Sequence, residues 1–277
     1  MKGAFSSPDE VLEREIMNHL FPDTTYGCES GGDPKNIPDL TYENFLNFHR
    51  TYYHPSNSYI YLYGNMDMEE KLAFLDEHYL SHFDYLDVDS VIQEQKAFGA
   101  CRDVTLEYPV AENEGEEDNT YLSYNMVVGN AADSQMAMAF EVLDYALLSA
   151  PGAPLKQALL DVKAGKDVYG SYDDGILQPY FTVIAKGSNP DRKEEFVSVI
   201  RQVLGDIVKN GIDRKAVEAG INYFEFRYRE ADFSSYPKGL MYSLDILGDW
   251  LYEKGNPFAQ VQPVSYTHLT LPTNSRV

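Results

Sequence analysis

Two histidines in the segment EHYLSH, His78 and His82, have the residue type and spacing best suited to metal chemistry in this sequence. Side chains four residues apart lie on one face of a helix, and two imidazoles on one face can bind zinc. The pattern H-x-x-E-H also places a glutamate that accepts a proton from zinc-bound water. Ser81 stands at that position here, and its hydroxyl does not take up this proton at neutral pH. We interpret the pair as surface histidines and expect neither a metal ligand nor a catalytic residue.

Nucleophile and phosphate-binding patterns are also weak in this sequence. Cys28 falls in a predicted loop with no defined base, and no Gly-x-Ser-x-Gly segment is present. Cys28 and Cys101 are the two cysteines and lie far apart, which favours free thiols in a reducing compartment. The pair Gly31 and Gly32 allows backbone angles closed to other residues. Because no Gly-Lys-Ser/Thr follows, we favour a structural turn over a phosphate-binding loop.

Charge and hydropathy disfavour several classes of protein. The 22 basic and 44 acidic residues give a formal net charge of −22, and a nucleic-acid partner is disfavoured because binding to phosphates needs cations. An acidic surface is typical of a solvated protein, and it also attracts basic ligands. No stretch approaches the ~18 apolar residues of a membrane helix, and the N-terminus has no signal-peptide pattern. We therefore expect a cytoplasmic protein with no membrane partner.

The first 90 residues predict three helices and a single strand. Ser7-Pro8 is typical of a helix start, with Ser7 and Glu10 as a capping box, and further helices are expected from Thr41 and over 67–82. Residues 57–64 alternate between tyrosines and aliphatic side chains, which predicts a strand. One strand cannot form a sheet. We expect its partners to lie upstream, so that residues 1–90 are an incomplete domain.

A second unit follows a polar linker at 91–100. Apolar alternation predicts antiparallel strands, and longer amphipathic stretches predict helices that cover them. The expected fold class is α+β, with a mostly antiparallel sheet under a helical layer, over residues 101–262. The expected strands are 102–109, 120–128, 168–172 and 179–186, and the expected helices are 132–149, 154–163, one after Pro190, one capped by Asp213, and 240–252.

The last residues, 263–277, differ from the rest of the chain. No acidic residue follows Glu253, although acidic residues are frequent before it. The stretch has no periodicity that would seat it on a core, and it is typical of non-native read-through of adapter sequence. A genuine extended tail is the alternative.

Several short segments, taken in order, resemble the insulinase (pitrilysin) family of zinc metallopeptidases, and within it the presequence protease subfamily. The set is specific because both order and spacing match over most of residues 1–260. The segments are MKGAF at 1–5, LFPDTTY at 20–26, SGGDP at 30–34, IPDLT at 37–41 and YHPSN at 53–57.

The resemblance implies an architecture and a chemistry. Such enzymes join two halves, each of two related α/β domains, into a closed chamber that cuts unfolded peptides. An H-x-x-E-H helix and a later glutamate supply the zinc ligands and the base, and the resemblance puts that glutamate just before Met1, outside this chain. It also implies that Tyr26, Ser30, Gly31 and Gly32 line the chamber wall.

These expectations together describe a fragment of a zinc metalloendopeptidase. Zinc would belong to the parent enzyme and none to this chain, which we expect to be inactive alone. Its partners would be peptide substrates, basic ones among them, and the missing N-terminal segment and C-terminal half of the same polypeptide. Two alternatives stay open: a non-catalytic scaffold or peptide-binding subunit of the same fold, and an unrelated small enzyme that uses His78 and His82.

Overall fold

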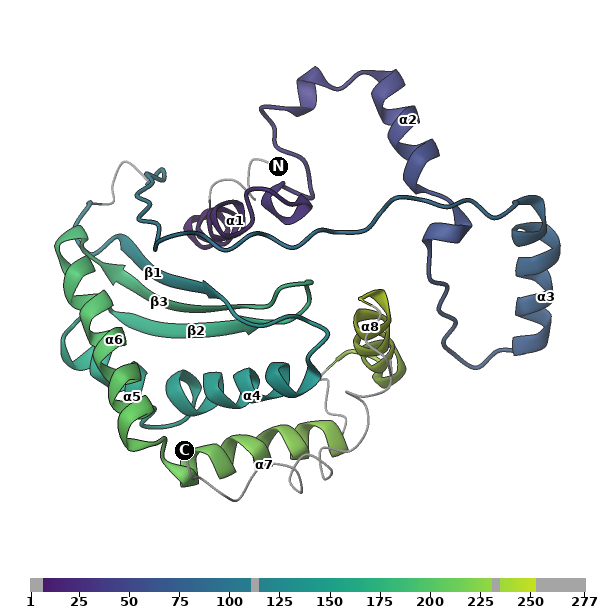
Figure 1. Cartoon of the computed structure of the whole chain (residues 1–277). Coiled ribbons are helices and arrows are strands. Elements are labelled where there is room, and N and C mark those ends of the chain that lie inside the picture. The colour runs from purple at the N-terminus through teal and green to yellow at the C-terminus, as the bar shows by residue number, and fades with distance from the viewer. Residues whose placement is uncertain (1–6, 111–114, 231–234, 253–277) are drawn as a thin grey trace.

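A three-stranded antiparallel sheet is the centre of the computed structural model, which describes residues 7–110, 115–230 and 235–252 (Figure 1). Its order is β1 (Thr120–Val127), β3 (Tyr180–Ser188), β2 (Asp167–Asp173). Both outer strands pair antiparallel with β3, with Tyr124 opposite Val183 and Val168 opposite Ala185. The predicted α+β class is therefore confirmed.

The main hydrophobic core lies between one face of the sheet and a layer of helices. Because side chains alternate along a strand, Phe181, Val183 and Ala185 of β3 all point into this core. Phe196 and Ile200 meet them from α6. The layer consists of α4 (Ser134–Asp144) with a π-helical turn (Tyr145–Ser149), α5 (Pro154–Asp161) and α6 (Lys193–Asn210). In Figure 1, α7 (Arg214–Glu230) packs outside α4.

A second, smaller core covers the opposite face of the sheet. The helix α1 (Pro8–Leu20) places Ile16 against it, and Phe21, fully buried just after the helix, packs against Tyr180 of β3. Lys186 Nζ adds an ion pair to Asp9 at 2.8 Å. The predicted capping box of α1 is wrong: the Ser7 side chain makes no capping bond, and its backbone carbonyl accepts from Val11 instead.

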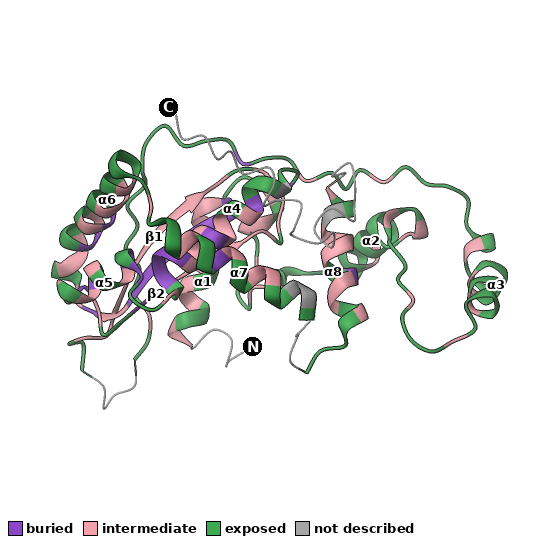
Figure 2. Ribbon diagram, turned by 90° about the horizontal axis from the view of Figure 1, so that it is seen from below, coloured by how far each residue is buried: buried purple, intermediate pink, exposed green. Residues whose placement is uncertain are grey.

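Residues 42–90 form an arm that extends away from the sheet (Figure 1). It carries α2 (Tyr42–Tyr52) and α3 (Met68–His78), and neither helix contains a buried residue. Figure 2 shows the contrast, with buried residues around the sheet and exposed or intermediate ones on the arm. Short 3-10 turns lie at Thr25–Gly27, Ile37–Asp39, Pro55–Asn57, Leu80–His82 and Pro190–Arg192.

The predicted strand at 57–64 is wrong, because no neighbouring strand in the described chain offers these residues a backbone ladder. Its tyrosines instead contact α8 (Lys238–Leu251). The Tyr61 hydroxyl donates to the carbonyl of Gly239 at 2.8 Å, and the ring of Tyr59 lies 5.1 Å from that of Trp250. We call this contact the α8 seam. The alternation places the tyrosines on one side of the segment, and that side packs on a helix, not on a neighbouring strand.

The predicted strand at 102–109 is also wrong. These residues form no ladder with β1, and side chains hold Tyr108 near its start. The Tyr108 ring packs edge-on against Tyr121 at 5.9 Å, and its hydroxyl donates to the carbonyl of Asn119. Contacts made by the Tyr108 side chain thus replace the backbone pairing that alternation alone predicts.

The predicted linker at 91–100 is fastened at one buried residue, Gln95. Its side chain accepts from the Asp23 backbone N–H at 2.9 Å and donates to the Asp23 carboxylate at 2.7 Å. Its backbone N–H donates to the Gln178 side chain at 2.6 Å. Gln95 therefore joins the loop after α1 to the loop before β3. Among the described residues, no helix combines the length and apolar character needed to cross a membrane.

Candidate functional site

The two histidines singled out by spacing do not share a helical face. Helix α3 ends at His78 because Tyr79 adopts φ −138° and ψ −66°, and His82 falls in the following 3-10 turn. The prediction of one helix over 67–82 is wrong for its last turn, because the α-helix ends at His78. Both histidines are exposed, and the described residues contain no group of three or more His, Cys, Asp or Glu placed to hold a metal. These residues therefore do not fit a zinc ion.

The four predicted chamber residues fall in different surroundings. The Tyr26 ring packs edge-on against Phe21, with centroids 5.9 Å apart, and its hydroxyl lies 2.7 Å from that of Tyr252. The same hydroxyl accepts from the Leu177 backbone N–H at 3.2 Å. Ser30 and Gly31 are exposed. Gly32 is the one of the four that lines the pocket described next.

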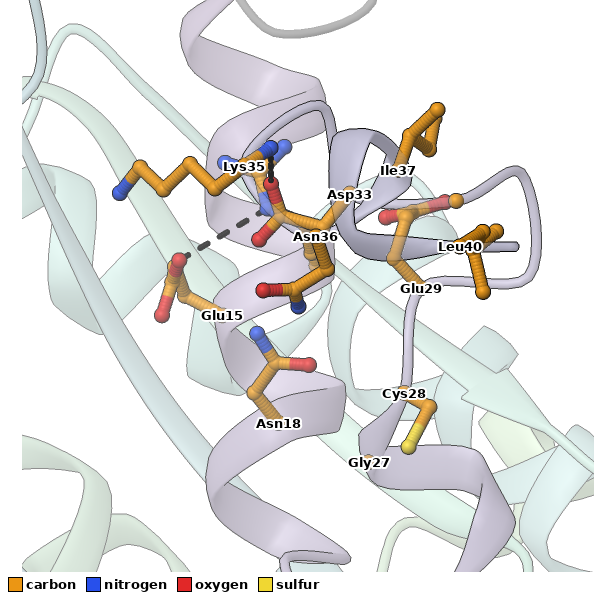
Figure 3. Close-up of a pocket in the computed structure, with 12 residues that line it drawn as sticks. Glu15, Asn18, Gly27, Cys28, Glu29, Asp33, Lys35, Asn36, Ile37 and Leu40 are labelled. Carbon is orange, nitrogen blue, oxygen red and sulfur yellow. Dashed lines mark hydrogen bonds and ion pairs between the residues drawn. The ribbon is translucent and has the colours of Figure 1, made fainter. Parts of the chain in front are cut away.

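A surface pocket of about 430 Å³ lies between the outer side of α1 and the loop from Gly27 to Leu40 (Figure 3). Pockets for small ligands typically measure about 300–1,000 Å³, so the volume suits a small group or one or two peptide residues. The helix contributes Arg14, Glu15 and Asn18, which stand on its solvent side. The sequence gives no signal for these three residues, because nothing in α1 distinguishes them from ordinary surface positions.

The pocket loop is held by a series of tight turns. Backbone bonds run from Gly32 to the carbonyl of Glu29 at 3.1 Å and from Ile37 to that of Asp33 at 3.0 Å. Gly32 has φ +85°, a conformation that side chains disfavour. A Cβ at Gly27 would lie 2.3 Å from a backbone oxygen. The glycines at 31–32 therefore serve a structural turn, as predicted, and the loop keeps the pocket open.

The pocket carries more negative than positive groups. Glu29 and Asp33 each accept one backbone N–H of their own loop, at 3.3 Å and 2.8 Å, which leaves a second carboxylate oxygen on each. Glu15 lies 3.7 Å from the guanidinium of Arg14. No hydrogen bond engages the carboxamides of Asn18 and Asn36 within the described part of the chain, and Figure 3 shows them pointing toward one another.

A separate set of acidic side chains surrounds Glu141 of α4, in the helical layer. Burial, with the nearby carboxylates of Asp174, Asp245 and Asp144, raises the pKa of Glu141 on α4 to about 7, and Arg227 on α7 opposes the shift. Burial also raises the pKa of Asp144. Near neutral pH, Glu141 is therefore partly protonated.

Comparisons with known proteins agree on the family. The sequence profile described as "Peptidase M16 inactive domain" matches residues 39–224. The chain is 47% identical, over 95% of its length, to "Protein HypA" of Clostridium perfringens, and 35% identical, over 100% of its length, to "Presequence protease 1, chloroplastic/mitochondrial" of Arabidopsis thaliana. It spans about a quarter of these relatives, 27% and 26% respectively.

Solved structures show the same fold. An M16-like peptidase from Alicyclobacillus acidocaldarius superposes with a TM-score of 0.63 at 17% identity, over 97% of this chain and 62% of that one. A peptidase M16 inactive domain from Pseudomonas fluorescens gives 0.57 at 17% identity, over 95% and 58%. At this identity the likeness concerns the fold alone. With the profile match over 39–224, it follows that this chain belongs to the M16 (insulinase, or pitrilysin) family of peptidases.

Proposed function

We propose that this chain is a non-catalytic part of a zinc-dependent peptidase that degrades unfolded peptides. The observation that carries the proposal is the match of the inactive-domain profile to residues 39–224, joined to similarity with a presequence protease along the whole chain. In this proposal the zinc ligands belong to the rest of a longer polypeptide. No catalytic step is assigned to the residues of this chain.

The part played by this chain would be to shape and charge the space in which a peptide is held. The formal net charge of −22 supports a preference for basic peptides, because an acidic surface attracts cations before contact. The predicted division into residues 1–90, a linker at 91–100 and a domain at 101–262 belongs to the same proposal. The buried hydrogen bonds of Gln95 support a fixed connection between these parts.

The test measures metal content and cleavage by the purified chain. After incubation with zinc and removal of excess metal, we expect no stoichiometric zinc by elemental analysis and no zinc-dependent cleavage of a quenched fluorescent peptide. Stoichiometric zinc together with cleavage would overturn the proposal. The variant His78→Ala/His82→Ala is the matched control, since any activity that depends on this pair is lost in it.

A second candidate is a peptide-binding scaffold of the same fold, and the description of the matched domain as inactive favours it. The two candidates differ in the coding sequence upstream of Met1. An H-x-x-E-H segment followed by a glutamate just before Met1 indicates the enzyme. Substitution of those positions indicates the scaffold.

A further inference from the structure

The pocket between α1 and the Gly27–Leu40 loop contains two polar side chains that nothing in the described fold uses. Asn18 is half-buried and Asn36 exposed, and neither carboxamide makes a hydrogen bond to the described residues. Each carboxamide presents N–H donors and a carbonyl acceptor. A peptide group also has an N–H donor and a carbonyl acceptor, so each carboxamide can donate to its carbonyl and accept from its N–H.

The surroundings of these amides add a charge preference. Glu29 and Asp33 each keep one carboxylate oxygen open after bonding their own loop. Of the two cations, Arg14 is paired with Glu15, and Figure 3 shows the ammonium of Lys35 on the opposite side of the pocket from Glu29. A basic side chain entering beside Glu29 therefore meets net negative charge.

Apolar groups complete the lining. Ile37 and Leu40 lie on the same side as Glu29 (Figure 3), and Leu40 is 63% exposed. Lysine and arginine bury their aliphatic stems on apolar surface while the charged ends stay with polar groups. Ile37 and Leu40 beside Glu29 thus match the two parts of such a side chain.

We propose that Asn18 and Asn36 clamp the backbone of an extended peptide in this pocket, while Glu29 and Asp33 receive a lysine or arginine side chain of that peptide. The inference rests on the proposed function for the class of ligand, but it concerns binding and needs no metal. The turns of the loop, with Gly27 and Gly32, keep the site formed before the peptide arrives, so little ordering opposes binding.

The experiment is a fluorescence anisotropy titration of the full chain, in the presence of a metal chelator, with a labelled unstructured peptide that contains two arginines. We expect Asn18→Ala/Asn36→Ala to weaken binding about thirty-fold, as the loss of two hydrogen bonds predicts. Glu29→Gln/Asp33→Asn keeps the loop acceptors and removes the charge, and should weaken binding about ten-fold. A peptide with glutamate in place of arginine should bind poorly to every form.

The matched control is Asn47→Ala, an exposed asparagine on α2 outside the pocket. Equal binding by the unmutated chain and Asn18→Ala/Asn36→Ala, or no binding by the unmutated chain, overturns the proposal. A second measurement excludes collapse of the loop as the cause of weak binding. In NMR spectra of the unmutated chain, the peptide should shift the side-chain amide signals of Asn18 and Asn36 and leave that of Asn47 in place.

Because the titration measures binding in the absence of metal, its outcome is independent of the test for zinc. Binding with no cleavage in any longer form would retain the clamp and refute the peptidase proposal. Cleavage by a longer form with no binding at this pocket would do the reverse.

Discussion

The sheet domain and the arm carry the same kind of amphipathic helix, but their apolar faces are covered to very different degrees. Phe196 and Ile200 of α6 are 1% and 0% exposed, whereas Phe45 and Phe48 of α2 are 65% and 59% exposed. The spacing of these residues predicts a helix with one apolar face in both cases. The pattern therefore predicts which face of the helix is apolar. Whether that face is buried depends on the part of the molecule that packs against it.

The two helices differ in exposure because different parts of the molecule lie against their apolar faces. In the sheet domain, β3 is paired on both edges, and its apolar side chains give α6 a surface to pack on. In the arm, residues 57–64 have no strand beside them among the residues that the structure describes. The tyrosines of this segment pack against α8 on one side. On the other side, Ile60 is 49% exposed. The arm thus leaves large apolar side chains exposed that the sheet domain would bury.

The largest test of this contrast compares two phenylalanines. Phe196→Ala should lower the free energy of unfolding by about 3–5 kcal/mol, because it removes a buried ring and leaves a cavity. Phe45→Ala removes an exposed ring and should change it by about 0.5 kcal/mol or less. Urea denaturation followed by circular dichroism measures both. Equal losses would show that the arm is packed in solution, contrary to the structure.

The next test uses the charge state of Glu141. Its pKa of about 7 in the folded chain lies above the ordinary value of 4.5, so the folded state holds a proton that the unfolded state has released. Stability from this group therefore falls as pH rises from 4.5 to about 7 and stays low above that. The difference amounts to about 3 kcal/mol. Glu141→Gln should be more stable by up to that amount above pH 7.

Thermal melts at several pH values check this expectation. Glu77→Gln, an exposed position at the end of α3 in the arm, is the matched control and should change stability by less than about 0.5 kcal/mol. The Glu141→Gln curve should meet that of the unmutated chain near pH 4.5 and separate from it as pH rises. Curves that stay parallel at all pH values would contradict the assignment.

The accuracy of the sequence predictions follows the same contrast. The helices of the sheet domain and the strands 120–127, 167–173 and 180–188 were expected nearly as found, because their local pattern and their packing agree. The segments 57–64 and 102–109 have the pattern of strands but no ladder. A strand needs a neighbour, and alternation along one segment carries no information about its neighbour.

The pocket was less predictable than the fold. Its loop was recognised from its glycines and prolines, and Gly32 was among the residues named. Tyr26, a further predicted chamber residue, is half-buried and contacts Phe21 and Tyr252, so its place on a chamber wall stays a prediction. Asn18 was not named, because one surface asparagine on a helix gives no signal. It becomes notable only when the fold places Asn36 across from it (Figure 3).

The α8 seam offers a smaller test, in which the single tryptophan, Trp250, is the reporter. A Cβ at Gly239 would lie 1.8 Å from the Tyr63 ring, so Gly239→Ala should displace the arm from α8 at a cost of about 1–3 kcal/mol. Trp250 emission should shift to longer wavelength as Tyr59 moves away. Gly248→Ala, in the same helix with nothing within 4 Å, should leave the emission unchanged.

The smallest expected effect comes from removing one hydroxyl of the seam. Tyr61→Phe loses the bond to the Gly239 carbonyl and should weaken the seam by about 0.5–1.5 kcal/mol. The sheet makes no contact with this hydroxyl, so the circular dichroism transition should stay in place while the Trp250 transition moves to lower urea. Tyr42→Phe, at a ring 77% exposed, is the control and should move neither transition. If both transitions of Tyr61→Phe moved together, the arm and the sheet domain would unfold as one unit, and the difference in their burial would not make them independent.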